Sequence, residues 1–340
     1  MLKYCFSYDI RNDNKISVTD VRKDFFTYVC HISKEVFFML LEDVLKEYLY
    51  DCQLRKLSER TIKSLRNNNN RLFQFLGCTN AIFELEEVRR VHIQTLINNL
   101  SELGHKETYI NSLIKSFRAF FRYCEDEGYI KESPMNKVRF QKEEIPVILT
   151  FNDDEIRKMV GHYSGRRFLE QRNKLIIVML LDSGIRNSEL CDIKLEDVHE
   201  NAIKIHGKGK KIRYVPLTPA INKALIRYLR IRDSYVLDKY TYQVEYLFLS
   251  QKGKRLTPET IERVVRDCGK ECGVREELRC SPHTCRHFYA QTQLKNGCDL
   301  FTVSRLLGHS NINITKRYLN SMGVEDVMEL AKKTTPLRNL

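Results

Sequence analysis

Four residues near the end of the chain have side chains that could cleave a phosphodiester. His283 and Arg286 lie one helical turn apart, His309 ends the sequence LLGH, and Tyr318 follows nine residues later. Arginine offers paired donors that match phosphate oxygens, and histidine exchanges protons near neutral pH. Tyrosine can form a covalent intermediate. Together these residue types predict attack on a phosphodiester without a metal ion, which directs the interpretation towards DNA strand breakage.

Two further segments carry residues suited to the same chemistry. Arg186 lies in LLDSGIRNSEL, where one apolar helix is expected to end at Gly184 and another to begin, so that Glu189 can hold the guanidinium. Lys208 lies in GKGKK, whose glycines let the backbone approach a ligand closely. This segment lacks the pattern of a nucleotide-binding P-loop. Each segment taken alone is more typical of a solvated surface.

Residues 147–340 are expected to form a mixed α/β domain that positions these side chains. Two alternating segments, Ala202–His206 and Ile212–Leu217, predict a β-hairpin with Lys208 at its tip. Leu247–Leu249 is a further candidate strand. Much of the remaining sequence is expected to be helical.

The sequence also marks where the helix carrying His283 and Arg286 begins. Ser281-Pro282 predicts a helix start, because proline fits the first helical position. His283 and Arg286 would then lie in the first turn, where free N–H groups and the helix dipole favour a bound phosphate. Gly297 and Gly308 are expected to end the helices that follow.

Residues 36–140 show helical periodicity and are expected to form a second, all-helical domain. The clearest segment is Thr108–Cys124, with an apolar stripe and a polar stripe about a third of a turn apart. A linker is predicted from Glu144-Ile145-Pro146, and residues 1–35 form an extension of unknown role. The predicted fold class is mainly α with a small antiparallel β-sheet. The apolar stripe consists of Ile110, Leu113, Ile114, Phe117, Phe120 and Phe121.

The polar side chains of this helical domain are candidates for contacts with DNA. A stripe of long polar side chains is usually a solvated face, but it also suits the DNA major groove and its flanking phosphates. The candidate DNA-binding residues are Lys63, Arg66, Asn111, Lys115, Arg118 and Arg122.

Composition favours a polyanionic partner. The formal net charge is +13 and the pI is about 9.1, which favours nucleic acid over a membrane surface. The 11 cysteines are odd in number and scattered, as expected for reduced thiols in a cytoplasmic protein. No apolar run is long enough to span a bilayer, and no signal peptide is recognisable.

A zinc site is the weaker alternative for one part of the same region. Its candidate ligands lack the CxxC pairing of structural zinc sites, so no metal and no cofactor is expected. These candidates are Cys268, Cys272, Cys280, Cys285, His283 and His287.

Taken in their order along the chain, the candidate residues from Arg186 to Tyr318 resemble those of the tyrosine recombinase (phage integrase) family. The matching segments are SGIRNSEL, IHGKGKKIRYVPL, SPHTCRH, LLGHS and ITKRY, and the resemblance extends over residues 38–340. It implies a site-specific recombinase in which Tyr318 attacks DNA and forms a 3′-phosphotyrosine, with neither metal nor ATP. The resemblance further implies one role for each remaining residue: Arg186 and Arg286 hold the phosphate oxygens, Lys208 protonates the leaving 5′-oxygen, His283 assists proton transfer at the tyrosine, His309 hydrogen-bonds the phosphate, and Glu189 supports the arrangement.

The resemblance also implies partners. Residues 38–132 resemble the core-binding domain, so double-stranded DNA target sites and a homotetramer on synapsed DNA are expected. The tail, residues 321–340, has the spacing of a short amphipathic helix, and the resemblance implies that it packs on a neighbouring protomer; docking on its own domain is the alternative. Residues 1–35 do not clearly resemble an arm-binding domain, which leaves open an integrase of a mobile genetic element and a simpler Xer-like recombinase. A telomere resolvase, a type IB topoisomerase and a catalytically silent DNA-binding protein are the alternatives.

Overall fold

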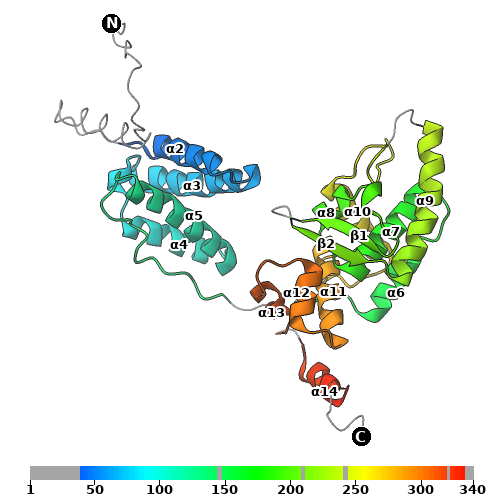
Figure 1. Ribbon diagram of the computed structural model, residues 1–340. Coiled ribbons are helices and arrows are strands. Elements are labelled where there is room, and N and C mark those ends of the chain that lie inside the picture. Colours follow the sequence, from blue (N-terminus) through cyan, green and yellow to red (C-terminus); the bar gives the residue numbers. More distant parts are fainter. Residues whose placement is uncertain (1–38, 144–147, 208–210, 240–243, 320–321, 334–340) are drawn as a thin grey trace, which may run out of the picture. The chain divides into compact units, whose positions relative to one another are not determined.

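The computed structural model describes residues 39–143, 148–207, 211–239, 244–319 and 322–333. These residues form two compact units, one before and one after residues 144–147, and each is described by itself (Figure 1). Both units are mainly helical, and the described strands form a two-stranded antiparallel sheet, which confirms the predicted fold class. The predicted extension 1–35 and Lys208 lie outside the described residues.

The first unit is built around one central helix. Its elements are α2 (Leu41–Leu54), α3 (Glu59–Asn80), the 3₁₀ helix η1 (Leu85–Glu87), α4 (Arg90–Glu102) and α5 (Glu107–Asp126). Helix α5 packs against α2, α3 and α4, and its whole predicted apolar stripe is buried. The ring of Phe120 packs against the rings of Tyr48 and Phe73 in T-shaped, edge-to-face contacts, at centroid distances of 5.8 and 5.5 Å. The stripe therefore forms the core of this unit.

The second unit contains a β-hairpin among helices. Strand β1 (Ala202–His206) pairs antiparallel with β2 (Ile212–Pro216), with Lys204 opposite Tyr214. The helices are α6 (Asp153–His162), α7 (Phe168–Ser183), α8 (Asn187–Asp192), α9 (Pro219–Lys239), α10 (Pro258–Glu271), α11 (Pro282–Lys295), α12 (Leu300–Leu307), α13 (Asn313–Leu319) and α14 (Val324–Lys333), with the 3₁₀ helix η2 (Leu195–Asp197) before the hairpin.

The expected strand at Leu247–Leu249 does not form in this sheet. The segment is fully buried; Tyr246 before it forms an isolated bridge with Lys194, and Leu249 forms another with Arg255. Side chains take its carbonyl groups instead: Arg232 and Tyr228 donate to Leu247, and Arg172 donates to Leu249. An apolar run of three residues cannot reveal this in advance, because its backbone partners come from distant helices.

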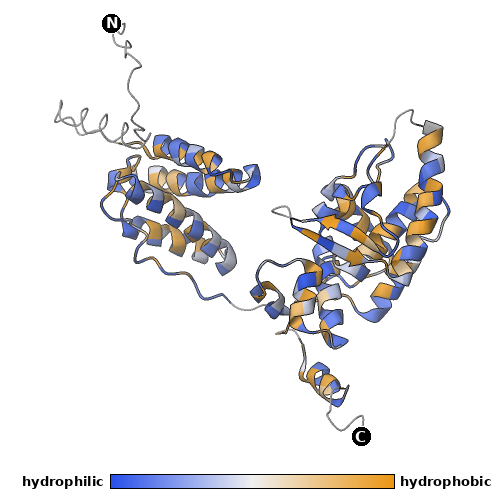
Figure 2. Cartoon of the chain, viewed as in Figure 1, coloured by the Kyte–Doolittle hydropathy of each residue, from blue (hydrophilic) through white to orange (hydrophobic). Residues whose placement is uncertain are grey.

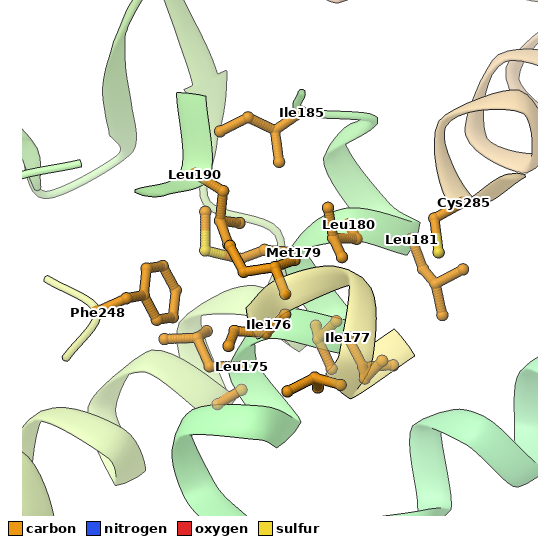
Figure 3. Close-up of a cluster of buried hydrophobic side chains, with 14 of the residues drawn as sticks. Leu175, Ile176, Ile177, Met179, Leu180, Leu181, Ile185, Leu190, Phe248 and Cys285 are labelled. Carbon is orange, nitrogen blue, oxygen red and sulfur yellow. The ribbon is translucent and has the colours of Figure 1, made fainter. Parts of the chain in front are cut away.

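Helix α7 forms the centre of the second unit. Its residues 175–181 are at most 5% exposed, and α6, α9, α10 and α11 pack around it. Figure 3 shows these side chains gathered with Phe248 and Cys285. The helix ends at Gly184, whose φ of +58° is easy only for glycine. A Cβ there would lie 2.6 Å from the ring of Tyr289, so the end of α7 sits tightly against α11.

The described helices carry polar faces as well as apolar ones. Figure 2 shows hydrophilic and hydrophobic residues alternating around many of them. Among the described residues, no helix has both the length and the apolar character needed to cross a bilayer.

Candidate active site

Three arginines from different elements meet at the C-terminal end of helix α12. A helix ends with carbonyl groups that have no partner within the helix, and these carry partial negative charge. Here three successive carbonyls of that end accept bonds from three guanidinium groups. Arg213 donates to Leu306 at 3.0 Å, Arg286 to Leu307 at 2.7 Å and Arg186 to Gly308 at 2.9 Å.

Glu189 connects two of these arginines. Its carboxylate accepts two bonds from Arg213, at 3.0 and 2.7 Å, and one from the side chain of Arg186 at 2.7 Å. The backbone N–H of Arg186 adds a fourth bond at 3.0 Å. Burial alone would favour the neutral acid, but the bonds and charges of Arg213 and Arg186 hold the pKa of Glu189 below its usual range. Glu189 is thus a buried carboxylate that fixes both guanidinium groups.

Arg286 is the most deeply placed of the three arginines. It is 5% exposed and donates a second bond to the carbonyl of Gly184 at 2.6 Å. Burial, together with the charges of Arg186 and Arg213, lowers the pKa of Arg286 to about 10. The guanidinium is therefore still charged at neutral pH. Positive charge is concentrated here without a matching number of carboxylates, which suits an anion.

His309 follows directly on this arginine cluster. Gly308 ends α12 with a φ of +66°, and a Cβ there would lie 3.2 Å from the side chain of Arg213. The Nδ1 atom of His309 lies 2.7 Å from the hydroxyl of Thr315, a fully buried residue of α13. Burial and then the charges of the three arginines lower the pKa of His309 to about 4. A neutral imidazole therefore connects the arginine cluster to the helix that carries Tyr318.

Tyr318 is 3% exposed on α13, and its hydroxyl lies 2.9 Å from Nδ1 of His287. Burial raises the pKa of the phenol, and the nearby charges of Arg286 and Arg317 act in the opposite direction. His283 lies one turn before His287 on α11 and is exposed. The histidine in contact with the phenol is therefore His287, whereas the resemblance implies that His283 assists proton transfer at the tyrosine.

The end of the β-hairpin borders the same carboxylate. A Cβ on Gly207 would lie 3.8 Å from Oε1 of Glu189 and 3.2 Å from the carbonyl of Lys211. The residue after Gly207 is Lys208. The described part of the hairpin thus ends beside the arginine cluster.

The candidate DNA-binding residues of the first unit fall into two groups. Lys63 and Arg66 on α3 and Lys115 and Arg122 on α5 are exposed. Asn111 is 3% exposed and does not fit the predicted role, because its amide bonds with the backbone of Gln141 and the side chain of Glu143.

Arg118 is also engaged within its own unit. Its guanidinium stacks on the ring of Phe140, 4.1 Å from the centroid, and donates to the carbonyl of Val138. Arg118 is therefore less available to a ligand than the four exposed residues. Its contacts tie the segment after Val138 to α5.

The cysteine-rich segment packs into the core of the second unit. Cys268 and Cys285 are fully buried, and burial raises the pKa of both thiols well above the usual range. In the described ranges, no three His, Cys, Asp or Glu side chains are grouped in a way that could hold a metal ion. The buried thiols behave as small apolar side chains.

Comparison with known proteins identifies the family. The phage integrase family matches residues 149–323. Over 285 residues the chain is 33% identical to the tyrosine recombinase XerC of Thermodesulfovibrio yellowstonii, an alignment that covers 82% of this chain and 91% of that relative. The chain belongs to the phage integrase family. It is a tyrosine recombinase.

Solved structures share the fold of this tyrosine recombinase. A structure of XerH bound to a palindromic difH substrate, in a post-cleavage complex, has a TM-score of 0.67 at 19% identity and covers 89% of this chain and 98% of that one. A λ integrase tetramer bound to a Holliday junction has a TM-score of 0.63 at 17% identity, covering 86% of this chain and 87% of that one.

Two residues of the recombinase site were not among the predicted site residues. Arg213 lies in the quoted segment IHGKGKKIRYVPL, and it shares the inward face of β2 with the buried Val215. A charged residue at an inward strand position was the available signal. His287 follows Arg286 directly, but its position gave no sign of which histidine faces Tyr318.

The two lowered histidine pKa values predict a pH-dependent stability of the recombinase. The pKa values of His287 and His309 are about 4 in the folded protein, against 6.5 for an ordinary histidine. Between these values the unfolded chain binds more protons, so the free energy of unfolding should fall as the pH drops from 6.5 towards 4. Each histidine contributes up to about 1.4 kcal/mol per pH unit.

Urea unfolding at several pH values, followed by circular dichroism, measures this slope. His309→Asn should make it shallower. The matched control is His199→Asn, since His199 is exposed on the same unit. If His309→Asn had the same slope as the unmodified protein, the lowered pKa of His309 would be contradicted.

Proposed function

We propose that this tyrosine recombinase breaks and rejoins duplex DNA at specific sites through a 3′-phosphotyrosine at Tyr318, without metal or ATP. The observation that carries the proposal is the convergence of three charged arginines on the end of α12, with Tyr318 buried beside Arg286. Phosphoryl transfer depends mainly on positioning and on stabilisation of charge, and this cluster supplies both. The phosphotyrosine retains the energy of the broken bond, so rejoining needs no nucleotide.

The proposed roles combine these positions with the roles that the family resemblance implies. Arg186 and Arg286 hold the non-bridging oxygens of the scissile phosphate, and His309 donates a hydrogen bond to it. Lys208 protonates the departing 5′-oxygen. Glu189 holds Arg186 in place through the two bonds described above. A bound phosphate would take over some of the arginine hydrogen bonds that the α12 carbonyls accept. The new bonds would be stronger, because both partners are charged.

Capture of the covalent intermediate tests this function. Fragments of the source genome are incubated with the protein in EDTA, denatured, and the DNA that stays attached is sequenced. We expect one short sequence to be enriched, joined to protein through its 3′-phosphate. Adducts that required an added divalent metal would contradict the proposed mechanism. Relaxation of any supercoiled plasmid, with no enriched sequence, would instead indicate a topoisomerase.

Lys208→Ala tests the proposed general acid. The normal site should be cleaved at least about 100-fold more slowly, since an alkoxide leaving group needs a proton. A substrate with sulfur in place of the bridging 5′-oxygen needs no such proton, so the variant should cleave it at nearly the rate of the unmodified protein. Equal defects on both substrates would assign the acid to another group, with Lys210 or Lys211 next in the sequence.

We propose that the first unit binds the DNA backbone through Lys63, Arg66, Lys115 and Arg122. These four side chains are exposed and positively charged, and α3 and α5 pack against each other. Binding measured at several salt concentrations should weaken less steeply in Lys115→Ala, because fewer counterions are then released. An unchanged slope would remove Lys115 from the interface.

We propose a homotetramer on paired sites, with α14 as one of its contacts. Asp326 pairs with Lys295 on α11 at 3.0 Å, and Leu330 lies near Gly297. Val324, Val327 and Met328 are more than half exposed, and a short helix gains stability when its apolar face is covered. Chain termination after Met322 should leave binding to one site intact and reduce assembly on paired sites, as counted by mass photometry.

The site of action is proposed to be the cytoplasm. The nine cysteines in the described ranges are free thiols, as in proteins from a reducing compartment. Fractionation of cells that produce the protein would test this.

A further inference from the structure

The hydrogen bond between Tyr318 and His287 gives the nucleophile a specific partner. It joins Oη of Tyr318 to Nδ1 of His287 at 2.9 Å, and the two ring centroids lie 5.5 Å apart at 60°. A hydrogen bond of this length is short enough for direct proton transfer. Tyr318 itself is 3% exposed, so bulk water has little access to the phenol.

We propose that His287 is the proton acceptor for Tyr318, a role that rests on the proposed function of Tyr318 as nucleophile. When Oη forms its bond to phosphorus, the phenolic proton passes to Nδ1 of His287, and the P–O5′ bond breaks as the 5′-oxygen takes a proton from Lys208. On rejoining, the attacking 5′-hydroxyl gives its proton to Lys208 as the P–O5′ bond forms. The P–Oη bond breaks, and His287 returns its proton to Oη. Protons and charge balance over the full cycle.

The surroundings of His287 explain why the acceptor is inactive without DNA. The charged and titratable groups that face it are His283 and Arg286 on α11, Arg317 and Tyr318 on α13, and His309 between α12 and α13. Burial and then the nearby positive charges lower the pKa of His287 to about 4. A base that weak does not deprotonate a phenol in the free protein. The nucleophile therefore stays protonated and unreactive.

A bound phosphodiester changes this balance. It brings negative charge to Arg286, whose positive charge otherwise disfavours the imidazolium form of His287. The charge on phosphate grows further in the transition state, which stabilises an adjacent imidazolium still more. Substrate binding thus raises the basicity of His287 at the moment when Tyr318 must lose its proton.

His283 is the alternative acceptor. It lies in the first turn of α11 and is exposed, whereas the bond to the phenol comes from the histidine one turn later. An exposed histidine at a helix N-terminus is better placed for the phosphate than for a phenol buried below it.

The test compares His287→Asn with His283→Asn by single-turnover cleavage of the enriched DNA site. Asparagine places an oxygen close to the position of Nδ1, so it can hold the phenol but cannot take its proton. We expect His287→Asn to cleave at least about 100-fold more slowly, in line with the usual contribution of a general base. Circular dichroism and DNA binding confirm that each variant is folded.

Fluorinated tyrosine at position 318 separates proton removal from positioning. Its phenol loses the proton more readily, so it should recover at least about tenfold of the lost rate in His287→Asn. The same replacement in the unmodified protein and in His283→Asn corrects for its weaker nucleophilicity. A normal rate in His287→Asn, or a slow rate that fluorotyrosine does not improve, would overturn the proposal.

Two further outcomes are informative. If fluorotyrosine restored the cleavage rate only in His283→Asn, the proton acceptor would be His283, and the role of His287 would be overturned. An adduct that persists in Tyr318→Phe would instead show that the nucleophile is wrong. This measurement leaves His283 and His287 unchanged, so failure of the proposed nucleophile is distinguishable from failure of the proposed proton acceptor.

Discussion

Tyr318→Phe is expected to bind the DNA site with unchanged affinity and to form no covalent adduct. The change removes only Oη, the proposed attacking atom, and a phenyl ring cannot replace it. On a nicked substrate that traps the intermediate, the yield should fall by at least about 1,000-fold. Denaturing gels of radiolabelled DNA measure the adduct, and mobility shifts measure binding.

The fold of this variant should survive. The ring of Tyr318 packs in an apolar cluster with Tyr289, Leu294, Val303 and Leu307, and phenylalanine keeps those contacts. The lost hydrogen bond to His287 costs about 1 kcal/mol. The chain has 17 tyrosines, so an adduct at the original yield would assign the nucleophile to another of them.

Arg213→Met is expected to lower the free energy of unfolding of the second unit by about 3–5 kcal/mol, because it leaves part of a buried charge without a partner. Glu189 is 6% exposed and would keep only its bonds to Arg186. Leu306 would also lose its donor at the end of α12. Cleavage should fall as well, since the carboxylate then holds Arg186 less rigidly.

The effect should depend on pH with a definite sign. The pKa of Glu189 is depressed in the folded protein, so its contribution is present above the unfolded value of about 4.3 and is lost as pH falls through the lower folded value. Arg213→Met should therefore be most destabilising at neutral pH, and the difference should shrink in acid.

Urea unfolding by circular dichroism measures the effect of Arg213→Met, as the chain contains no tryptophan. Arg157→Met is the matched control, because Arg157 pairs with Asp154 on the surface and both are about three-quarters exposed. An exposed pair contributes little, so stability there should be unchanged within error. If the two substitutions lowered the free energy of unfolding equally, the buried Arg213–Glu189 pair would contribute no more stability than an exposed pair.

Sequence reasoning works best here where a residue's role depends on its neighbours along the chain. The apolar stripe of α5 and the hairpin are local patterns, and the structure matches them closely. Helix α11 begins at Pro282 as its capping signal indicates. Arg186 and Glu189, three residues apart, form the expected pair.

The rest depends on contacts between distant segments. Asn111 belongs to the polar stripe by periodicity, yet residues 141 and 143 fold back onto it and bury it. His283 and His287 differ by one helical turn, and only the approach of α13 decides which of them meets Tyr318. Arg213 finds Leu306 across 93 residues of sequence. No local pattern encodes such pairings.

The three arginine bonds to the end of α12 bear on how the charges of this site come together when the recombinase folds. In the structure, the carbonyls of Leu307 and Gly308 accept bonds from Arg286 and Arg186, the two arginines that we propose hold the phosphate, and the carbonyl of Leu306 holds Arg213 beside them. Folding alone therefore brings the three positive charges together, so the substrate does not have to gather them. Because the end of α12 holds all three guanidinium groups, a small shift of this one helix would change the positions of all three arginines together.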